Sequence, residues 1–167
     1  MRTPAWRWLL LLAALAAAAD SQKVERSPDR QLGAVVTENA SGETLVEFRT
    51  AAGRVLLRRD ERSSDGQHGQ GIVHSGWTAD SQWFVASTES SGGHQPWARP
   101  LWAYSRARNQ VFELDRFGVV AVDAFRLAPP DTVRVPTVCP PGEQRRPVTF
   151  RLAELLSGSL PNPCPAR

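Results

Sequence analysis

Short apolar stretches alternate with turn residues along most of the chain. In the stretch 44–49, Val46 and Phe48 fall on one side and Glu47 and Arg49 on the other. This period of two is that of a β-strand with one buried face. Beyond the first twenty residues, no long stretch repeats its apolar positions every 3.6 residues, as an amphipathic helix would. The pattern therefore predicts an all-β fold, a small antiparallel sheet or sandwich.

Turn residues divide the apolar pattern into ten predicted strands. They are 34–37, 44–49, 54–58, 72–77, 82–87, 101–105, 110–114, 119–127, 133–138 and 148–152. The polar segment 20–32 is expected to be a flexible lead-in, so that residues 33–167 form a single β-rich domain. Residues 152–156 fit a strand end or a helical turn that Ser157 and Gly158 close.

The segment 74–87 has the sequence HSGWTADSQWFVAS. Trp77, Asp80 and the strand 83–87 match the repeat of TolB-like and WD40-like β-propellers, which the segment resembles; Thr78, Ala79 and Ser81 stand where that repeat has Ser, Pro and Gly. The resemblance extends to residues 72–114 and implies a four-stranded, blade-like unit. It also implies a structural role for Asp80, which would cap the tight turn between two strands. It implies a scaffold and no particular chemistry.

The length limits what this resemblance means. A blade takes roughly 40–45 residues, so 167 residues cannot close a six- or seven-bladed ring. Residues 34–60 are a second, degenerate candidate blade. The alternatives are a small open sheet or sandwich built from blade-like units, or a chain truncated from a longer protein.

The first nineteen residues have the pattern of a secretory signal peptide. Arg2 and Arg7 precede an apolar run, and Ala17 and Ala19 satisfy the small-x-small cleavage rule. The run from 8 to 19 is shorter than the roughly 20 residues that span a bilayer. The sequence predicts an exported protein, periplasmic or extracellular, with no membrane span after cleavage.

The positive charge of the chain belongs largely to this leader. The formal net charge is +3, from 20 basic and 17 acidic residues. Removing residues 1–19 takes away two arginines and no acid, which leaves a charge of about +1. That balance, together with export, argues against a nucleic-acid partner.

The two cysteines lie in a proline-rich tail, 136–167. In an exported chain, Cys139 and Cys164 are most simply one structural disulfide. Closing a loop of this length stabilises a fold by roughly 3 kcal/mol in the chain-entropy model. No C-x-x-C spacing indicates a redox role.

Three histidines, His68, His74 and His94, lie in or beside glycine-rich loops. If the loops 63–71 and 88–100 meet at one edge of the sheet, these side chains could hold zinc or copper. Their spacing is not that of a recognised metal motif, so ordinary hydrogen-bonded loop histidines are the favoured interpretation. No cofactor is therefore expected.

All four tryptophans that follow the leader fall between positions 77 and 102. Such a cluster is either a binding surface, for sugar rings or for a peptide, or the core of a sheet with one loop aromatic folded over it. Trp97 lies in the predicted 88–100 loop, whereas Trp102 lies in a predicted strand. The ligand-contact candidates are thus His68, His94, Trp97 and Trp102.

No nucleophile, metalloprotease or phosphate-loop motif is present, so no catalytic residue is predicted. The sequence favours an exported, non-enzymatic binding or structural protein whose partner is a protein or a glycan. One alternative is a carbohydrate or cell-wall binding module that uses Trp97 and Trp102. A small metalloprotein or hydrolase that uses the three histidines is a weaker one.

Overall fold

The computed structural model describes residues 20–93, 99–117, 119–139 and 144–158. The described chain is all-β, as the pattern predicts. Its strands are β1 (Ser21–Arg26), β2 (Leu32–Glu38), β3 (Thr44–Thr50), β4 (Val55–Asp60), β5 (Gln70–Trp77), β6 (Trp83–Ser90), β7 (Arg99–Ser105), β8 (Gln110–Glu113), β9 (Val120–Ala121), β10 (Arg126–Ala128), β11 (Thr132–Cys139) and β12 (Gln144–Arg151).

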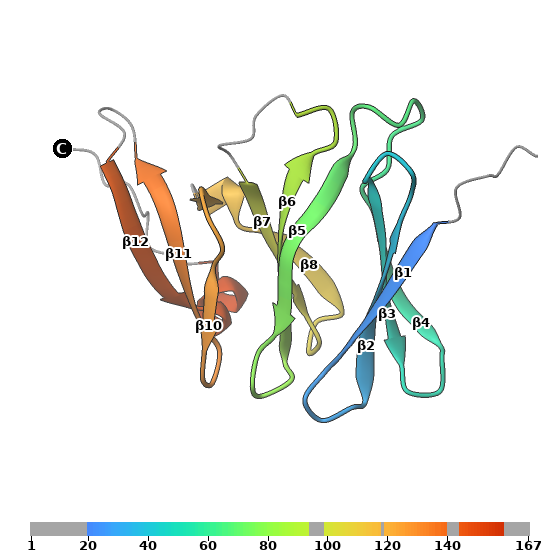
Figure 1. Cartoon of the computed structure of the whole chain (residues 1–167). Coiled ribbons are helices and arrows are strands. Elements are labelled where there is room, and N and C mark those ends of the chain that lie inside the picture. Colours follow the sequence, from blue (N-terminus) through green and yellow to red (C-terminus); the bar gives the residue numbers. More distant parts are fainter. Residues whose placement is uncertain (1–19, 94–98, 118, 140–143, 159–167) are drawn as a thin grey trace, which may run out of the picture.

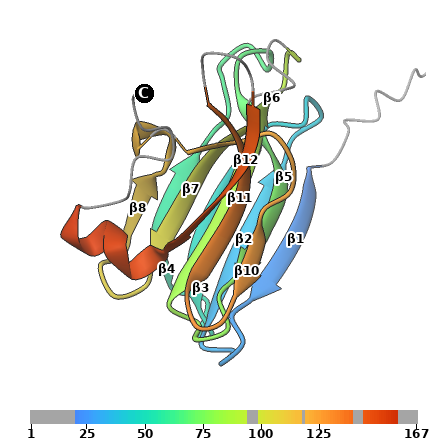
Figure 2. The same cartoon turned by 90° about the vertical axis from the view of Figure 1, so that its left-hand side faces the viewer.

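The strands form two antiparallel sheets that stack as three layers (Figure 1). The first sheet is the meander β1-β2-β3-β4. In the second sheet, the two-residue strand β9 pairs with both β7 and β11, and thereby joins the meander β5–β8 to the strands β10–β12. This sheet curls, so that β10–β12 form a third layer, which lies in front in Figure 2.

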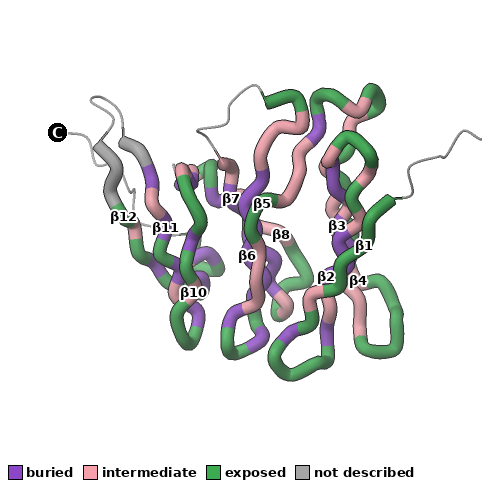
Figure 3. Tube along the Cα trace, viewed as in Figure 1, coloured by how far each residue is buried: buried purple, intermediate pink, exposed green. Residues whose placement is uncertain are grey.

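The middle layer is buried on both of its faces. Along β6, Trp83 and Val85 pack toward the third layer, and Phe84 and Ala86 pack toward the first sheet. An uninterrupted apolar run is what a strand covered on both sides requires. Figure 3 shows the buried positions gathered where the layers face one another.

The strands expected between 72 and 114 are β5, β6, β7 and β8, and they pair in chain order as a four-stranded antiparallel meander. Residues 34–60 supply most of a second meander, the first sheet. The flexible lead-in expected at 20–32 is wrong over part of its length, because Ser21–Arg26 is strand β1 and pairs along its full length with β2. The strand expected at 119–127 is instead β9 and β10.

Asp80 caps the turn between β5 and β6. The Asp80 carboxylate accepts hydrogen bonds from the Gln82 backbone N–H, at 3.0 Å, and from the Thr78 hydroxyl, at 2.6 Å. Ser81, in the same turn, has a positive φ of 63°. The turn thus keeps a backbone conformation for which glycine is the usual residue.

The helices of the described chain are two short 3₁₀ segments, η1 (Asp115–Phe117) and η2 (Leu152–Ser157). Gly158 ends η2 in the left-handed conformation, with φ 72°, so of the two alternatives for 152–156 the structure has the helical turn. Across the described ranges, neither helix has the length and apolar character needed to cross a bilayer.

Candidate functional site

Two loops that the sequence singles out meet at one end of the first two layers. The β4–β5 connection, residues 61–69, lies against the end of β6, where the Ser91 backbone N–H donates to the Gly69 carbonyl at 3.0 Å. The register of β5 and β6 pairs Gln70 with Ser90 directly beside this contact. The 63–71 loop and the described start of the 88–100 segment thus lie side by side, which is the condition that the metal-site alternative set. We call residues 61–69 and 90–93 the composite loop surface.

A buried carboxylate holds this surface together. Glu43, in the β2–β3 turn, has no solvent-exposed area. Its Oε1 accepts hydrogen bonds from the Ser63 hydroxyl at 2.7 Å, the Gly69 N–H at 2.7 Å and the Ser91 hydroxyl at 2.9 Å. Its Oε2 accepts the Ser63 backbone N–H at 3.0 Å. One side chain thus connects the first sheet to both loops.

These donors keep Glu43 ionised. The Ser63 hydroxyl, then the N–H groups of Ser63 and Gly69 and the Ser91 hydroxyl, lower the pKa of the Glu43 carboxyl from 4.5 to about 2, against the opposing effect of desolvation. A buried charge is tolerated only when its hydrogen-bonding capacity is met in this way. Glu43 is therefore a fixed anion at any pH near neutrality.

Glycine at position 69 is required by the close approach of the Glu43 carboxylate. A Cβ at Gly69 would lie 2.4 Å from Glu43 Cδ and 2.5 Å from the Glu61 carbonyl oxygen. The second of these is a backbone atom and cannot move aside. The loop can reach the carboxylate only because position 69 has no side chain.

The exposed part of the loop carries His68, one of the predicted contact residues. Its Nδ1 lies 2.5 Å from Asp65 Oδ2, and both side chains are more than half exposed. The Gln67 N–H, the Ser63 hydroxyl and the His68 ring together hold the pKa of the Asp65 carboxyl well below its usual range. The loop thus presents an anchored acid–imidazole pair to solvent.

His74 lies apart from this loop, in the middle of β5. Its ring packs edge-on against Phe125 at a centroid distance of 4.6 Å. It lines a cavity of about 720 Å³ shared with Asp123 and Arg126, and a second of about 340 Å³ shared with Lys23. Within the described ranges, no three His, Cys, Asp or Glu side chains come together as metal ligands would.

Trp102 belongs to the core, so the expectation that its ring contacts a ligand is wrong. The side chain has no exposed area and packs between the first sheet and the middle layer. The Arg59 guanidinium covers its ring at 4.8 Å, at the outer edge of the interface. A sugar needs an open ring face for stacking, and Trp102 has none.

The remaining candidates fall outside the part of the chain that the structure describes. His94 and Trp97 are in the segment 94–98, and Cys164 is in the segment 159–167. Cys139 ends β11, but its side chain is not described. The disulfide between Cys139 and Cys164 stays a prediction.

Glu43 is the residue that sequence reasoning misses. The loop residues that donate to it, Ser63, Gly69 and Ser91, lie 20 to 48 positions away, and no local pattern connects them to it. The one local signal is the glycine-rich loop 66–71, where close backbone approach is common. Comparison with protein-family models and with curated proteins finds no match to this chain.

Proposed function

We propose that this chain is an exported, non-enzymatic binding protein, in which a blade-like β-scaffold presents the composite loop surface to a protein or glycan partner. Export rests on the leader pattern of residues 1–19. The blade-like description rests on the motif in 74–87 and on the four-stranded meander β5–β8.

The observation that carries the proposal is the buried Glu43 carboxylate. Burying a charge is costly, and Glu43 makes the hydrogen bonds that offset this cost to Ser63, Gly69 and Ser91, all of which belong to the loop surface. The effect is to fix two exposed loops in one arrangement before any partner arrives. Preorganised loops on a rigid scaffold are typical of binding sites.

The chemistry of the surface favours a polar partner. The Asp65–His68 pair offers both a hydrogen-bond acceptor and an imidazole at an exposed position. Glycans and polar protein surfaces carry the matching groups. Of the two rings proposed for a glycan, Trp97 is the candidate that is left, since Trp102 is buried.

A site-specific photo-crosslinking experiment tests the proposal for a protein partner. A crosslinking amino acid replaces Gln67, which is exposed on the loop surface, or Ala52, which is equally exposed in the β3–β4 turn at the other end of the first sheet. In the compartment to which the chain is exported, we expect an adduct from position 67 and none from position 52.

A titration with soluble cell-wall glycans tests the second class of partner. We expect these glycans to quench the tryptophan fluorescence of the unaltered chain. His68→Ala should weaken the quenching and Trp97→Ala should abolish it. The control is Arg54→Gln, in the distant β3–β4 turn, which should leave the quenching unchanged. Absence of both a position-67 adduct and a glycan response would contradict the proposal. Stoichiometric zinc or copper in the purified protein would favour the metalloprotein alternative instead.

A further inference from the structure

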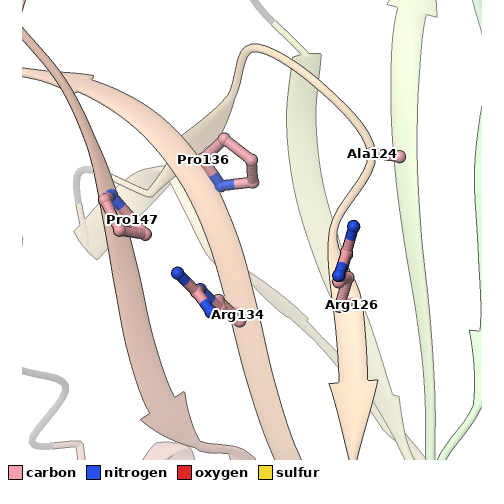
Figure 4. A pocket seen from close by; sticks show the side chains of 5 residues that line it. All are labelled: Ala124, Arg126, Arg134, Pro136 and Pro147. Carbon is pink, nitrogen blue, oxygen red and sulfur yellow. The ribbon is translucent and has the colours of Figure 1, made fainter.

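The third layer has one face turned away from the core, and two arginines lie side by side on it. Arg126 of β10 is directly opposite Arg134 of β11, and both side chains are exposed. In an antiparallel pair, opposite residues project from the same face with Cβ atoms about 5 Å apart. The two guanidinium groups therefore share one region of the surface, which Figure 4 shows.

Neither arginine is neutralised by an acid of the described chain. The contrast is Arg151 on β12, whose Nε lies 3.0 Å from Asp131 Oδ1. Asp123, the acid close to Arg126 in sequence, accepts the Ala124 N–H at 2.7 Å. Within the described ranges, no ion pair of 4.0 Å or less includes Arg126 or Arg134.

Such a pair is unfavourable for the isolated fold. Like charges directly opposite one another on neighbouring strands destabilise a sheet. An anion between them would remove the repulsion and form charge-assisted hydrogen bonds with both groups. Arginine matches a carboxylate in particular, because its planar fork donates two parallel N–H groups to the two oxygens.

The arginines border a cavity of about 270 Å³ whose other walls are apolar. Ala124, Pro136 and Pro147 line it together with Arg126 and Arg134 (Figure 4). Pro136 and Pro147 are themselves a cross-strand pair of β11 and β12. A proline in the edge strand β12 has no N–H with which to pair an added strand. A partner would therefore bind through side-chain contacts on this face and not by extending the sheet.

We propose that this face of β10–β12 binds the side-chain carboxylates of an acidic peptide segment from a partner protein. The Arg126–Arg134 pair receives the carboxylates, and the two proline rings pack against the aliphatic part of the same segment. A large polyanion is disfavoured, because the charge beyond residue 19 is only about +1 and Asp123 lines a cavity together with Arg126. The site is on a different layer from the composite loop surface and is independent of it.

Fluorescence polarisation of a labelled hexaglutamate peptide tests this site on the purified chain. The site variant is Arg126→Gln/Arg134→Gln, and the matched control is Arg54→Gln/Arg108→Gln, which removes the same charge from two exposed turns. We expect the unaltered chain to bind the peptide, more weakly as salt is raised, and not to bind labelled hexalysine. The site variant should lose at least about tenfold in affinity, while the control stays within about twofold.

Three further measurements complete the test. The double variant Arg126→Lys/Arg134→Lys should lose part of the affinity, since charge remains without the bidentate fork. Thermal melts of every variant show that the fold is retained, and any that unfolds is replaced by its single substitutions. Equal affinity for the site and control variants, no binding at all, or displacement by inorganic phosphate at concentrations where free glutamate has no effect would each overturn the proposal.

Discussion

The two interfaces between the layers are built differently. Among the described strands, none of the first sheet pairs through its backbone with one of the middle layer. These two layers are joined by an aromatic core and by side-chain contacts around its rim. Between the middle and third layers, β9 carries the backbone ladder from β7 to β11 around a larger apolar core. In the described chain, none of the ion pairs crosses this second interface.

The rim contacts surround the first interface. At one end, Arg106 pairs with Asp29, and the Ser81 hydroxyl accepts the Asp29 N–H. At the other end is the Glu43 cluster. The two remaining sides are tied by the Arg59–Glu113 ion pair and by the Trp77 indole N–H, which donates to the Glu25 carbonyl at 2.9 Å.

This difference predicts where the molecule responds to pH. Apolar side chains and backbone hydrogen bonds do not titrate between pH 2 and 8, whereas the carboxylates at the rim of the first interface do. The first sheet should therefore separate from the rest before the second sheet opens. The predictions below test that distinction.

The largest effect is expected from cutting away the aromatic centre of the first interface. Phe48 is fully buried and stacks on Tyr104 at a centroid distance of 3.7 Å. Phe48→Ala should cost about 3–5 kcal/mol in the free energy of unfolding, measured by urea denaturation. Phe150→Ala, at the second interface, is the matched control. It should cost a similar amount but raise hydrogen exchange in β10–β12 rather than in β1–β4.

A smaller but distinct loss is expected from Glu43→Gln. The amide keeps the shape of the side chain but brings N–H groups toward the donors of Ser63, Gly69 and Ser91, and so leaves some of them unpaired. The melting temperature should fall by several degrees. Glu38→Gln, at the exposed last residue of β2 just before the same turn, should leave it unchanged. Equal melting temperatures for the two variants would refute the anchoring role of Glu43.

Acid should weaken the first interface. The pKa of Glu43 is about 2 instead of 4.5, and hydrogen bonds from Ser27 and then Arg106 lower that of Asp29 from 3.8 to about 2. Because both values are depressed in the folded chain, their stabilisation is complete above pH 4.5 and is lost as the pH falls toward 2. Unfolding in urea between pH 6 and pH 2.5 should show this loss. In the variant Asp29→Asn/Glu43→Gln, the free energy of unfolding should fall less steeply with pH. An unchanged dependence on pH would contradict the assignment of this loss to Asp29 and Glu43.

The smallest effect is expected from Arg106→Gln. The Arg106–Asp29 pair is partly exposed, and exposed ion pairs contribute little because solvent screens them. The melting temperature should change by no more than a few degrees, and less as salt is added. A large, salt-independent drop would mean that this end of the interface matters more than the Glu43 cluster.

Patterning predicts the strands that burial controls. The apolar run at 83–86 indicates β6, and the alternation at 44–49 indicates β3, both close to their observed bounds. It misses β1, because Ser21–Arg26 carries a single apolar residue, Val24, and is held by pairing with β2 rather than by burial. An edge strand of this kind leaves no hydrophobic signature.

The site is less accessible to sequence reasoning than the fold. The sequence locates the two loops, but the residue that holds them together, Glu43, depends on partners in distant segments. Trp102 is a residue that the sequence pattern does single out but to which it cannot assign a role. A clustered tryptophan is compatible with a binding surface or a core, and only the three-layer stack, which covers both faces of β7, decides between them.

Native-state hydrogen exchange at pH 5 and pH 3, corrected for intrinsic rates, tests the difference between the interfaces most directly. The measurement compares amides of β2 and β3 with those of β11 and β12 on the same sample. We expect protection in β2 and β3 to fall at pH 3, while protection in β11 and β12 is retained. An equal loss in all four strands would contradict the account, because the chain would then open as one unit with no separable first interface.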